Sequence, residues 1–305
     1  MLADAVEIAA EPRRARSRRC ISIGGVSLAL NSATPAHLGL PSSLQGFEQE
    51  RQPCDIEISI TRDVWLPAAP GKPWFDSGAV WKLYQDDSTL TFDFACPLLG
   101  RTPYKRLQVD RQFSQARLSF HSGYAETTGF LHAFEYPLDE LLVTNRLAAV
   151  EGVEVHACGV VDASRRAQLF LGHSGAGKST TARLWRQLRN ARILSDDRII
   201  LRLSQDQLWM HGTPWHGEAG FAAADQAPVN AIFVLQHGVR NEIEALPPPQ
   251  AAAELFARSF VPFHNPEAIA TTLALFHWIV ERIPCYLFRF LPDRSAVASI
   301  LNFHG

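Results

Sequence analysis

The sequence predicts an α/β protein in which a strand-rich, antiparallel region precedes a core of alternating strands and helices. Three observations carry this prediction. Short strand patterns separated by turn signals fill residues 21–135. From residue 136 onward, apolar strand runs alternate with helical spacing. A glycine-rich segment, GHSGAGKS (172–179), lies between an apolar strand run and a helical run.

The composition is that of an ordinary globular protein and excludes several classes. Hydrophobic residues make up 47% and charged residues 20% of the chain, and the net charge of −2 gives no basic field for nucleic acid. The five cysteines are far apart and form no CxxC pair, which argues against a disulfide framework or a zinc site. No apolar run approaches the roughly eighteen residues of a membrane-spanning helix. We therefore expect a cytoplasmic protein that binds neither nucleic acid nor a membrane.

Residues 1–20 are predicted to form a disordered basic tail. The run RRARSRR (13–19) precedes ISIGGVSLAL, an arrangement that resembles a twin-arginine export signal. The apolar alternation around Gly24-Gly25 instead indicates two short strands joined by a tight turn. The arginine run is then a solvated tail.

The region 21–135 is predicted to be a twisted antiparallel sheet or small β-domain that helps to recognise a substrate. DIEISITRD (55–63) alternates apolar and polar residues. AVWKLY (79–84) and TLTFDF (89–94) flank the turn QDDS, and YKRLQVD (104–110) and ARLSF (116–120) form a second pair.

The region 136–305 is predicted to be the α/β core, with a mainly parallel sheet. A helix begins near Pro137, which suits a first helical position. The later elements follow from apolar spacing: strands at 153–161, 167–172, 192–203, 207–210, 229–236 and 285–290, and helices at 178–189, 250–259, 266–281 and 293–302.

The glycine-rich segment fits the P-loop pattern G-x-x-x-x-G-K-[ST] and has a strand before it and a helix after it. Its backbone N–H groups and the helix N-terminus would bind phosphate oxygens, Lys178 would reach the β- and γ-phosphates, and Ser179 would coordinate Mg²⁺. The alternative is a glycine-rich turn before a surface helix. The candidate nucleotide-binding residues are Gly172, His173, Ser174, Gly175, Ala176, Gly177, Lys178, Ser179 and Thr180.

A magnesium nucleotide site also needs a carboxylate, and LSDD supplies Asp196 and Asp197, seventeen and eighteen residues after Ser179. In a β-α-β unit the carboxyl ends of both strands meet at one sheet edge, so we expect this pair beside the loop. Adjacent strand residues point to opposite faces, so a bulge or a strand end must redirect one of them. The alternative is a solvated turn.

These motifs, together with His156 on the strand ahead of the loop, resemble the HPr kinase/phosphorylase catalytic core. The fold of that core is similar to that of ATP-dependent phosphoenolpyruvate carboxykinase. The resemblance covers roughly residues 137–300 and is closest to HPr-kinase-like proteins found beside peptide-maturation genes, including lasso-peptide kinases. It is carried by HACGVV, FLGHSGAGKST, LSDD, GTPWHGE (212–218) and CYLFRFLPD. The Glu-x-Arg-Gly-x-Gly motif of HPr kinases is absent, so HPr is not carried over as the substrate.

The resemblance implies ATP- and Mg²⁺-dependent transfer of the γ-phosphoryl group to a serine of a peptide or small protein, such as the C-terminal serine of a lasso-type precursor. We assign Asp196 as the base and Asp197 as the metal ligand, and the reverse stays open. His156 would hydrogen-bond the base or the phosphate. Glu218 is a candidate second metal ligand, with a surface acid as the alternative. A homo-oligomer also stays open.

Weaker candidates are Trp215 and His216 for the substrate cleft, Arg240 and Arg258 for phosphate, and His264, which we expect in a loop. Two other functions stay open. A kinase for a small metabolite such as free serine would not need a β-region of this length. A nucleotide sensor without catalysis would not need the paired aspartates.

Overall fold

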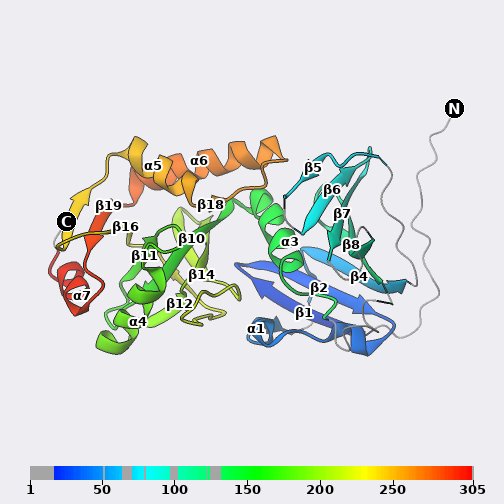
Figure 1. Ribbon diagram of the computed structural model, residues 1–305, viewed down its shortest axis with the longest axis horizontal. Helices are drawn as coiled ribbons and strands as arrows, with labels where there is room; N and C mark the ends of the chain where they lie inside the picture. Colours follow the sequence, from blue (N-terminus) through cyan, green and yellow to red (C-terminus); the bar gives the residue numbers. More distant parts are fainter. Residues whose placement is uncertain are drawn as a thin grey trace.

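Two β-sheets, one in each half of the chain, organise the structure (Figure 1). The computed structural model describes residues 17–50, 52–63, 71–78, 80–96, 102–121, 123 and 132–303. Most of the predicted basic tail and part of the Pro/Gly-rich stretch 66–73 therefore lie outside the described residues. The observed architecture is mixed α/β, as predicted.

The strands of the N-terminal sheet run in the order β3-β1-β2-β4-β9-β8-β7-β6-β5 within the described part of the chain. Their bounds are β1 (Ser17–Ile23), β2 (Val26–Ser32), β3 (Glu48–Gln49), β4 (Ile56–Asp63), β5 (Phe75–Asp76), β6 (Trp81–Gln85), β7 (Thr89–Ala95), β8 (Pro103–Asp110) and β9 (Gln115–His121). The short helices η1 (Pro35–Leu38) and α1 (Ser42–Gln45) lie between β2 and β3.

Two predictions for this half were wrong. The sheet is not wholly antiparallel, because β2 pairs with β4 and β4 with β9 in parallel. Both connections are long enough for a parallel crossover, whereas the tight turns that we recognised produce only antiparallel pairs. The arginine run is also not wholly a tail: Arg18 and Arg19 belong to β1 and make ion pairs with Glu57 and Glu48.

The C-terminal sheet runs in the order β15-β14-β13-β10-β11-β16-β19-β17, and β12 and β18 also pair with β10. The strands are β10 (Gly152–Val161), β11 (Ala167–Leu171), β12 (Arg192–Ser195), β13 (Arg198–Ser204), β14 (Gln207–Gly212), β15 (Gln226–Pro228), β16 (Ala231–His237), β17 (Glu242–Ala245), β18 (Ser259–Phe260) and β19 (Cys285–Phe290). The helices are α3 (Leu138–Leu147), η3 (Ala148–Val150), α4 (Lys178–Arg189), α5 (Pro248–Ala257), α6 (Pro266–Arg282) and α7 (Arg294–Leu301).

This sheet is mixed rather than mainly parallel, which corrects the prediction. Only β11, β16 and β19 are paired in parallel. Strands β10 and β11, and β13 and β14, are joined by short connections and are therefore antiparallel. The predicted strand 192–203 is also two strands, β12 and β13, which pair with successive parts of the same edge of β10.

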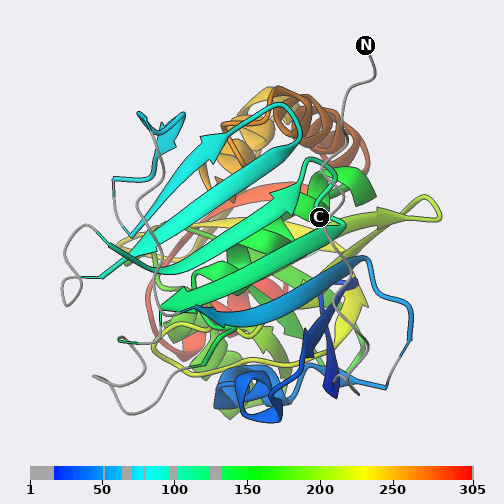
Figure 2. The same cartoon turned by 90° about the vertical axis from the view of Figure 1, so that its right-hand side faces the viewer.

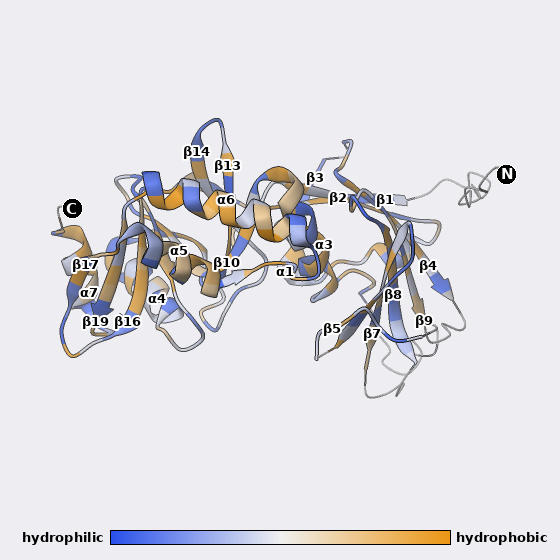
Figure 3. Cartoon of the chain, turned by 90° about the horizontal axis from the view of Figure 1, so that it is seen from above, coloured by the Kyte–Doolittle hydropathy of each residue, from blue (hydrophilic) through white to orange (hydrophobic). Residues whose placement is uncertain are grey.

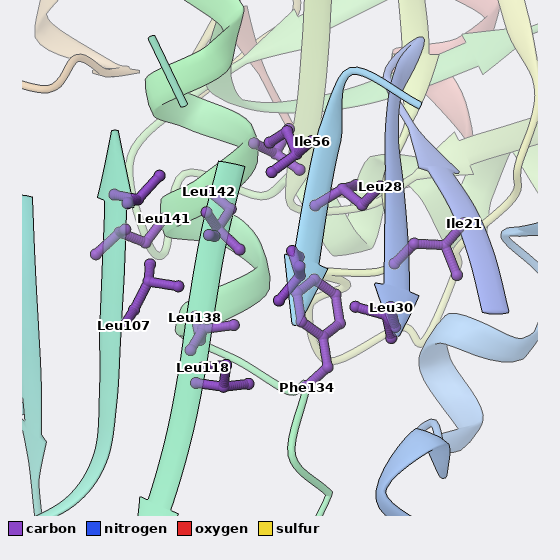
Figure 4. Packing of buried hydrophobic residues seen from close by; sticks show 14 of the residues in the cluster. Ile21, Leu28, Leu30, Ile56, Leu107, Leu118, Phe134, Leu138, Leu141 and Leu142 are labelled. Atoms are coloured by element: carbon purple, nitrogen blue, oxygen red, sulfur yellow. The ribbon is translucent and has the colours of Figure 1, made fainter. Parts of the chain in front are cut away.

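Helix α3 lies between the two sheets (Figure 3). Its apolar residues, among them Leu138, Leu141 and Leu142, pack into the core of the N-terminal sheet (Figure 4). Ile200 and Trp215 from the C-terminal half join the same core. The two halves are thus connected by buried apolar contacts, and the N-terminal sheet lies over the C-terminal half when viewed along the long axis (Figure 2).

The C-terminal sheet is buried on both faces. One face packs against α5 and α6 through residues such as Leu255 and Phe276. The other packs against α4 and α7 through residues such as Trp185 and Val297. Among the helices of the described residues, none is long and apolar enough to cross a membrane.

Candidate functional site

The glycine-rich loop joins a fully buried strand, β11, to the first residue of α4, Lys178. Gly175 and Gly177 have φ values of 79° and 101°, in the left-handed region that favours glycine. A Cβ at Gly177 would lie 2.6 Å from Cζ of Phe290, which is itself fully buried. The tip of the loop, 173–175, is exposed to solvent. The loop thus brings bare backbone to the surface in front of a helix N-terminus, which is the arrangement that binds anions.

Lys178 is 4% exposed, and its ammonium lies beneath this loop. Nζ donates hydrogen bonds to the carbonyl oxygens of Gly172 and His173, each at 3.0 Å. It also lies 3.4 Å from Oδ1 of Asp197. Burial lowers the pKa of Lys178, and the neighbouring carboxylate opposes this shift only in part.

Asp196 is fully buried, and both of its carboxylate oxygens are hydrogen-bonded. Oδ2 accepts from Oγ of Ser179 at 2.7 Å and from the backbone N–H of Ala219 at 2.9 Å. Oδ1 accepts from the backbone N–H groups of Gly217 and Phe221, each at 3.1 Å. Because a carboxylate offers about four lone-pair sites, Asp196 has little capacity left for a further partner.

Asp197 has a different environment, although it is the next residue. Oδ1 accepts from Nε2 of His156 at 2.8 Å, Oδ2 accepts from Arg198 at 2.8 Å, and a quarter of the side chain is exposed. Burial by itself would raise the pKa of Asp197. The hydrogen bond from His156 and the positive charges of Arg198 and Lys178 outweigh it and hold the pKa below its ordinary value.

The structure brings five of the sequence candidates together: Lys178, Ser179, Asp196, Asp197 and His156. The two aspartates occupy the break between β12 and β13, so the strand alternation that would send them to opposite faces does not apply. His156, on β10, also fixes the start of the loop, because its carbonyl oxygen accepts from the N–H of Gly172 at 3.0 Å.

A largely buried charge cluster behind Asp197 is absent from the sequence prediction. Nε of Arg198 lies 3.2 Å from Oε1 of both Glu140 and Glu154, and its guanidinium lies 4.1 Å from the ring centroid of Phe260. Glu154 is fully buried, and burial, with the adjacent Glu140, raises its pKa well above the ordinary value. Two features of the sequence could have indicated this cluster. Arg198 directly follows the Asp-Asp pair, and Glu154 lies two residues before His156, on the same face of the strand.

Two other contributors were also missed. The segment 217–221 donates backbone N–H groups to Asp196, and a Cβ at Gly217 would lie 2.8 Å from that carboxylate. The sequence signal for this close approach was Gly217, because a glycine leaves room for the carboxylate next to the backbone. His237 bonds the carbonyl oxygen of Gly175 through Nε2 at 2.9 Å and stacks on Phe290. Nothing local in the sequence indicates this second contact.

The weaker candidates have other surroundings. Trp215 is buried and donates to Oδ2 of Asp139 at 3.0 Å, so it packs between the halves rather than lining an open cleft. Arg240 pairs with Glu242, and Arg258 pairs with Glu254.

Glu218, the candidate second metal ligand, is exposed, and its carbonyl oxygen accepts from Arg183 at 3.1 Å. His216 is exposed and bonds the carbonyl oxygen of Gly217. His264 follows β18 in a loop, as expected, and bonds Asn145 at 3.0 Å.

The donor set fits a magnesium ion that is bound together with a polyphosphate. Among the described residues, no group of three or more His, Cys, Asp or Glu side chains could hold a metal ion by itself. Mg²⁺ in phosphate sites usually takes one or two protein oxygens and fills its other positions with water and phosphate. The hydroxyl of Ser179, which donates a hydrogen bond to Asp196, would supply one such protein oxygen.

Comparison with known proteins assigns no family to the chain. No family model matches it, and no curated protein matches it. Among solved structures, it is similar to the Hpr(Ser) kinase/phosphatase from Coxiella burnetii, with 14% sequence identity and a TM-score of 0.29 over 48% of this chain and 93% of that chain. At this distance the likeness carries no argument about activity.

Proposed function

We propose that this protein is an ATP-dependent kinase that transfers the γ-phosphoryl group to a serine hydroxyl of a peptide or small protein. The observation that carries the proposal is the convergence of a buried P-loop lysine, a serine–aspartate pair and an aspartate–histidine pair at one edge of a sheet. Phosphoryl transfer needs mainly positioning and charge neutralisation, and these groups supply both.

The loop binds the triphosphate of ATP. Its backbone N–H groups and the N-terminus of α4 face the phosphates, and Lys178 supplies a positive charge from beneath. Mg²⁺ bound with the nucleotide would neutralise phosphate charge, with the Ser179 hydroxyl as its ligand. Lys178 is held by two loop carbonyls and by Asp197, so it is positioned before the nucleotide arrives.

The contacts favour Asp197 rather than Asp196 as the base, and they leave the Ser179 hydroxyl as the protein ligand for Mg²⁺. Asp196 is saturated with hydrogen bonds, so it orients Ser179 and the segment 217–221. Asp197 is a quarter exposed and His156 holds it in place, so it is the carboxylate that an incoming hydroxyl can reach and to which it can pass a proton. As the serine oxygen bonds to the γ-phosphorus, the bond to the β-phosphate oxygen breaks, ADP leaves, and the serine proton passes to Asp197.

The direct test is transfer of label from γ-labelled ATP with Mg²⁺. The acceptors are a peptide library that contains serine, the same library with every serine replaced by alanine, and free serine. We expect label on the serine library alone, and none with the Lys178→Ala variant. Label on free serine but on no peptide would instead identify a metabolite kinase. Nucleotide binding without transfer to any hydroxyl would identify a sensor.

A further inference from the structure

A cavity of about 220 Å³ lies where the two halves of the chain meet. Its walls come from β5 and β6 of the N-terminal sheet, from α3, and from the segment 259–264 that leads into α6. Figure 1 shows these elements converging between the two sheets. Its lining residues include Pro137, Glu140, Asn145, Phe260, Phe263 and His264. We call this cavity the aromatic pocket.

The aromatic pocket shares two wall residues with the surroundings of Asp197. Glu140 lines the pocket, and its carboxylate lies 3.2 Å from Nε of Arg198, which in turn donates to Asp197. Phe260 also lines the pocket, and its ring centroid lies 5.9 Å from that of His156. A molecule in the pocket would therefore be separated from His156 by the ring of Phe260, and from the proposed base, Asp197, by the side chains of Glu140 and Arg198.

The rim of the pocket exposes aromatic surface. Trp74, Tyr136 and Phe263 are 48%, 59% and 58% exposed. In the described part of the chain, these three are the aromatic residues among the large hydrophobic side chains that are exposed. Phe263 lines the pocket, Tyr136 precedes the lining residue Pro137, and the Trp74 ring lies 6.0 Å from that of His264. Exposed aromatic residues gathered at one place are typical of surfaces that bind a partner.

The lining favours an uncharged occupant. Among the described lining residues, Glu140 is the one with a charged side chain, and its charge is already paired with that of Arg198. Burial lowers the pKa of His264 to about 4, so its ring is neutral near neutral pH, where it bonds Asn145. Drug-sized ligands occupy cavities of about 300 Å³ or more, so this smaller pocket suits a single side chain.

We propose that the aromatic pocket binds an aromatic side chain of the acceptor peptide, near the serine that is phosphorylated. The inference rests on the proposed function and adds a specificity determinant to it. A peptide is the occupant that the rim favours, because the exposed rings of Trp74 and Phe263 extend the apolar surface beyond the pocket. A peptide chain would lie across these rings while one of its side chains fills the cavity.

The test uses peptides with a single serine and one phenylalanine, placed at each position in turn on both sides of the serine, with alanine elsewhere. Transfer kinetics give KM and kcat for each peptide. Fluorescence anisotropy with labelled peptides measures binding without ATP. We expect phenylalanine at one position, or at two neighbouring ones, to lower KM and Kd about tenfold or more, which corresponds to burial of an aromatic side chain.

Two rim variants and one matched control locate the effect. Phe263→Ala and Trp74→Ala should raise KM about tenfold for the preferred peptide. They should leave KM unchanged for ATP and for the same peptide with its phenylalanine replaced by alanine. Leu273→Ala is the control, because Leu273 is 51% exposed on α6 and does not line the pocket. It should change none of these constants.

The outcomes separate this inference from the proposed function. If kcat/KM is the same for every position of the phenylalanine, the proposed pocket is wrong, but the proposed kinase activity is not affected. Binding of one peptide that Phe263→Ala abolishes, without any phosphoryl transfer, would support the pocket and reject the kinase. Absence of both binding and transfer overturns the pocket. Sedimentation that shows a dimer lost in Phe263→Ala would also overturn it, because the rim would then contact a second copy of the chain.

Discussion

At the scale of single residues, Asp196 and Asp197 show how two adjacent identical side chains acquire different chemistry. Asp196 is enclosed by four donors, three of them backbone N–H groups from 217–221. Asp197 faces side chains that can be charged, and part of it meets solvent. The first environment fixes a carboxylate in place, and the second leaves it able to exchange a proton.

Substitution of each aspartate by asparagine should therefore give different losses. Asp197→Asn should lower the transfer rate by about 10²-fold or more, because the proton acceptor is lost, with little change in the Kd for nucleotide. Asp196→Asn should weaken binding of the magnesium nucleotide and destabilise the fold by about 1–3 kcal/mol, because buried N–H groups lose an acceptor. Calorimetric titration, single-turnover kinetics and urea unfolding measure the three quantities. Loss of transfer with unchanged stability in Asp196→Asn, and normal transfer in Asp197→Asn, would restore the roles that we first assigned.

At the scale of elements, the loop between β11 and α4 depends on a contact with a distant strand. Phe290, at the end of β19, packs against Gly177 and beneath the ring of His237. Strand β19 pairs with β16, which pairs with β11, so the parallel part of the sheet sets the distance between Phe290 and the loop. The glycine pattern alone specifies a flexible backbone, and the neighbouring strands give it one conformation.

Two glycine variants separate backbone conformation from contact. Both Gly175 and Gly177 have positive φ, but a Cβ at Gly175 meets nothing within 4 Å, whereas one at Gly177 lies 2.6 Å from Phe290. Gly175→Ala should cost about 1 kcal/mol of stability, the usual cost of a left-handed residue. Gly177→Ala should cost about 2 kcal/mol more and weaken nucleotide binding, because Phe290 has no space into which to move. Thermal unfolding and nucleotide titration of both variants check this, and equal losses would show that the contact is unimportant.

At the scale of the whole molecule, the site is coupled to the interface between the halves. Trp215 packs into the core of the N-terminal sheet, and its indole donates to Asp139 on α3. Two residues further on, the chain begins to bind Asp196. Packing between the halves therefore positions the segment that holds one of the site's carboxylates.

We expect Asp139 to make the stability of this interface depend on pH. It is fully buried, and burial raises its pKa from 3.8 to about 6. An acid with a raised pKa in the folded state stabilises the fold while it is protonated, below about pH 4, and this contribution is lost as the pH rises through about 6. The full contribution of Asp139 to the free energy of unfolding is on the order of 3 kcal/mol.

Asp139→Asn keeps a neutral acceptor for Trp215 and should remove this pH dependence. The free energy of unfolding of the variant, minus that of the natural chain, should rise by on the order of 3 kcal/mol between about pH 4 and pH 7. Urea unfolding across this range measures the difference. Asp206→Asn, at an exposed turn, is the control for removal of a carboxylate. A relative stability that is the same at every pH would show that Asp139 is ionised in the fold.

The sequence by itself determined the elements whose signals are local. Apolar periodicity located most strands and helices to within a few residues, and the spacing from Gly172 to Ser179 identified the loop, because both patterns follow from the geometry of one segment. It also identified the Asp-Asp pair as lying beside that loop, because β12 follows α4 directly.

Only the tertiary structure decided features that join segments far apart in the chain. These are the parallel pairing of β4, the segment 217–221 that encloses Asp196, the cluster of Arg198 with Glu140 and Glu154, and the aromatic pocket. Each depends on which segments of the chain become neighbours. That choice is made by burial of apolar surface over the whole molecule, and no short stretch of sequence records it.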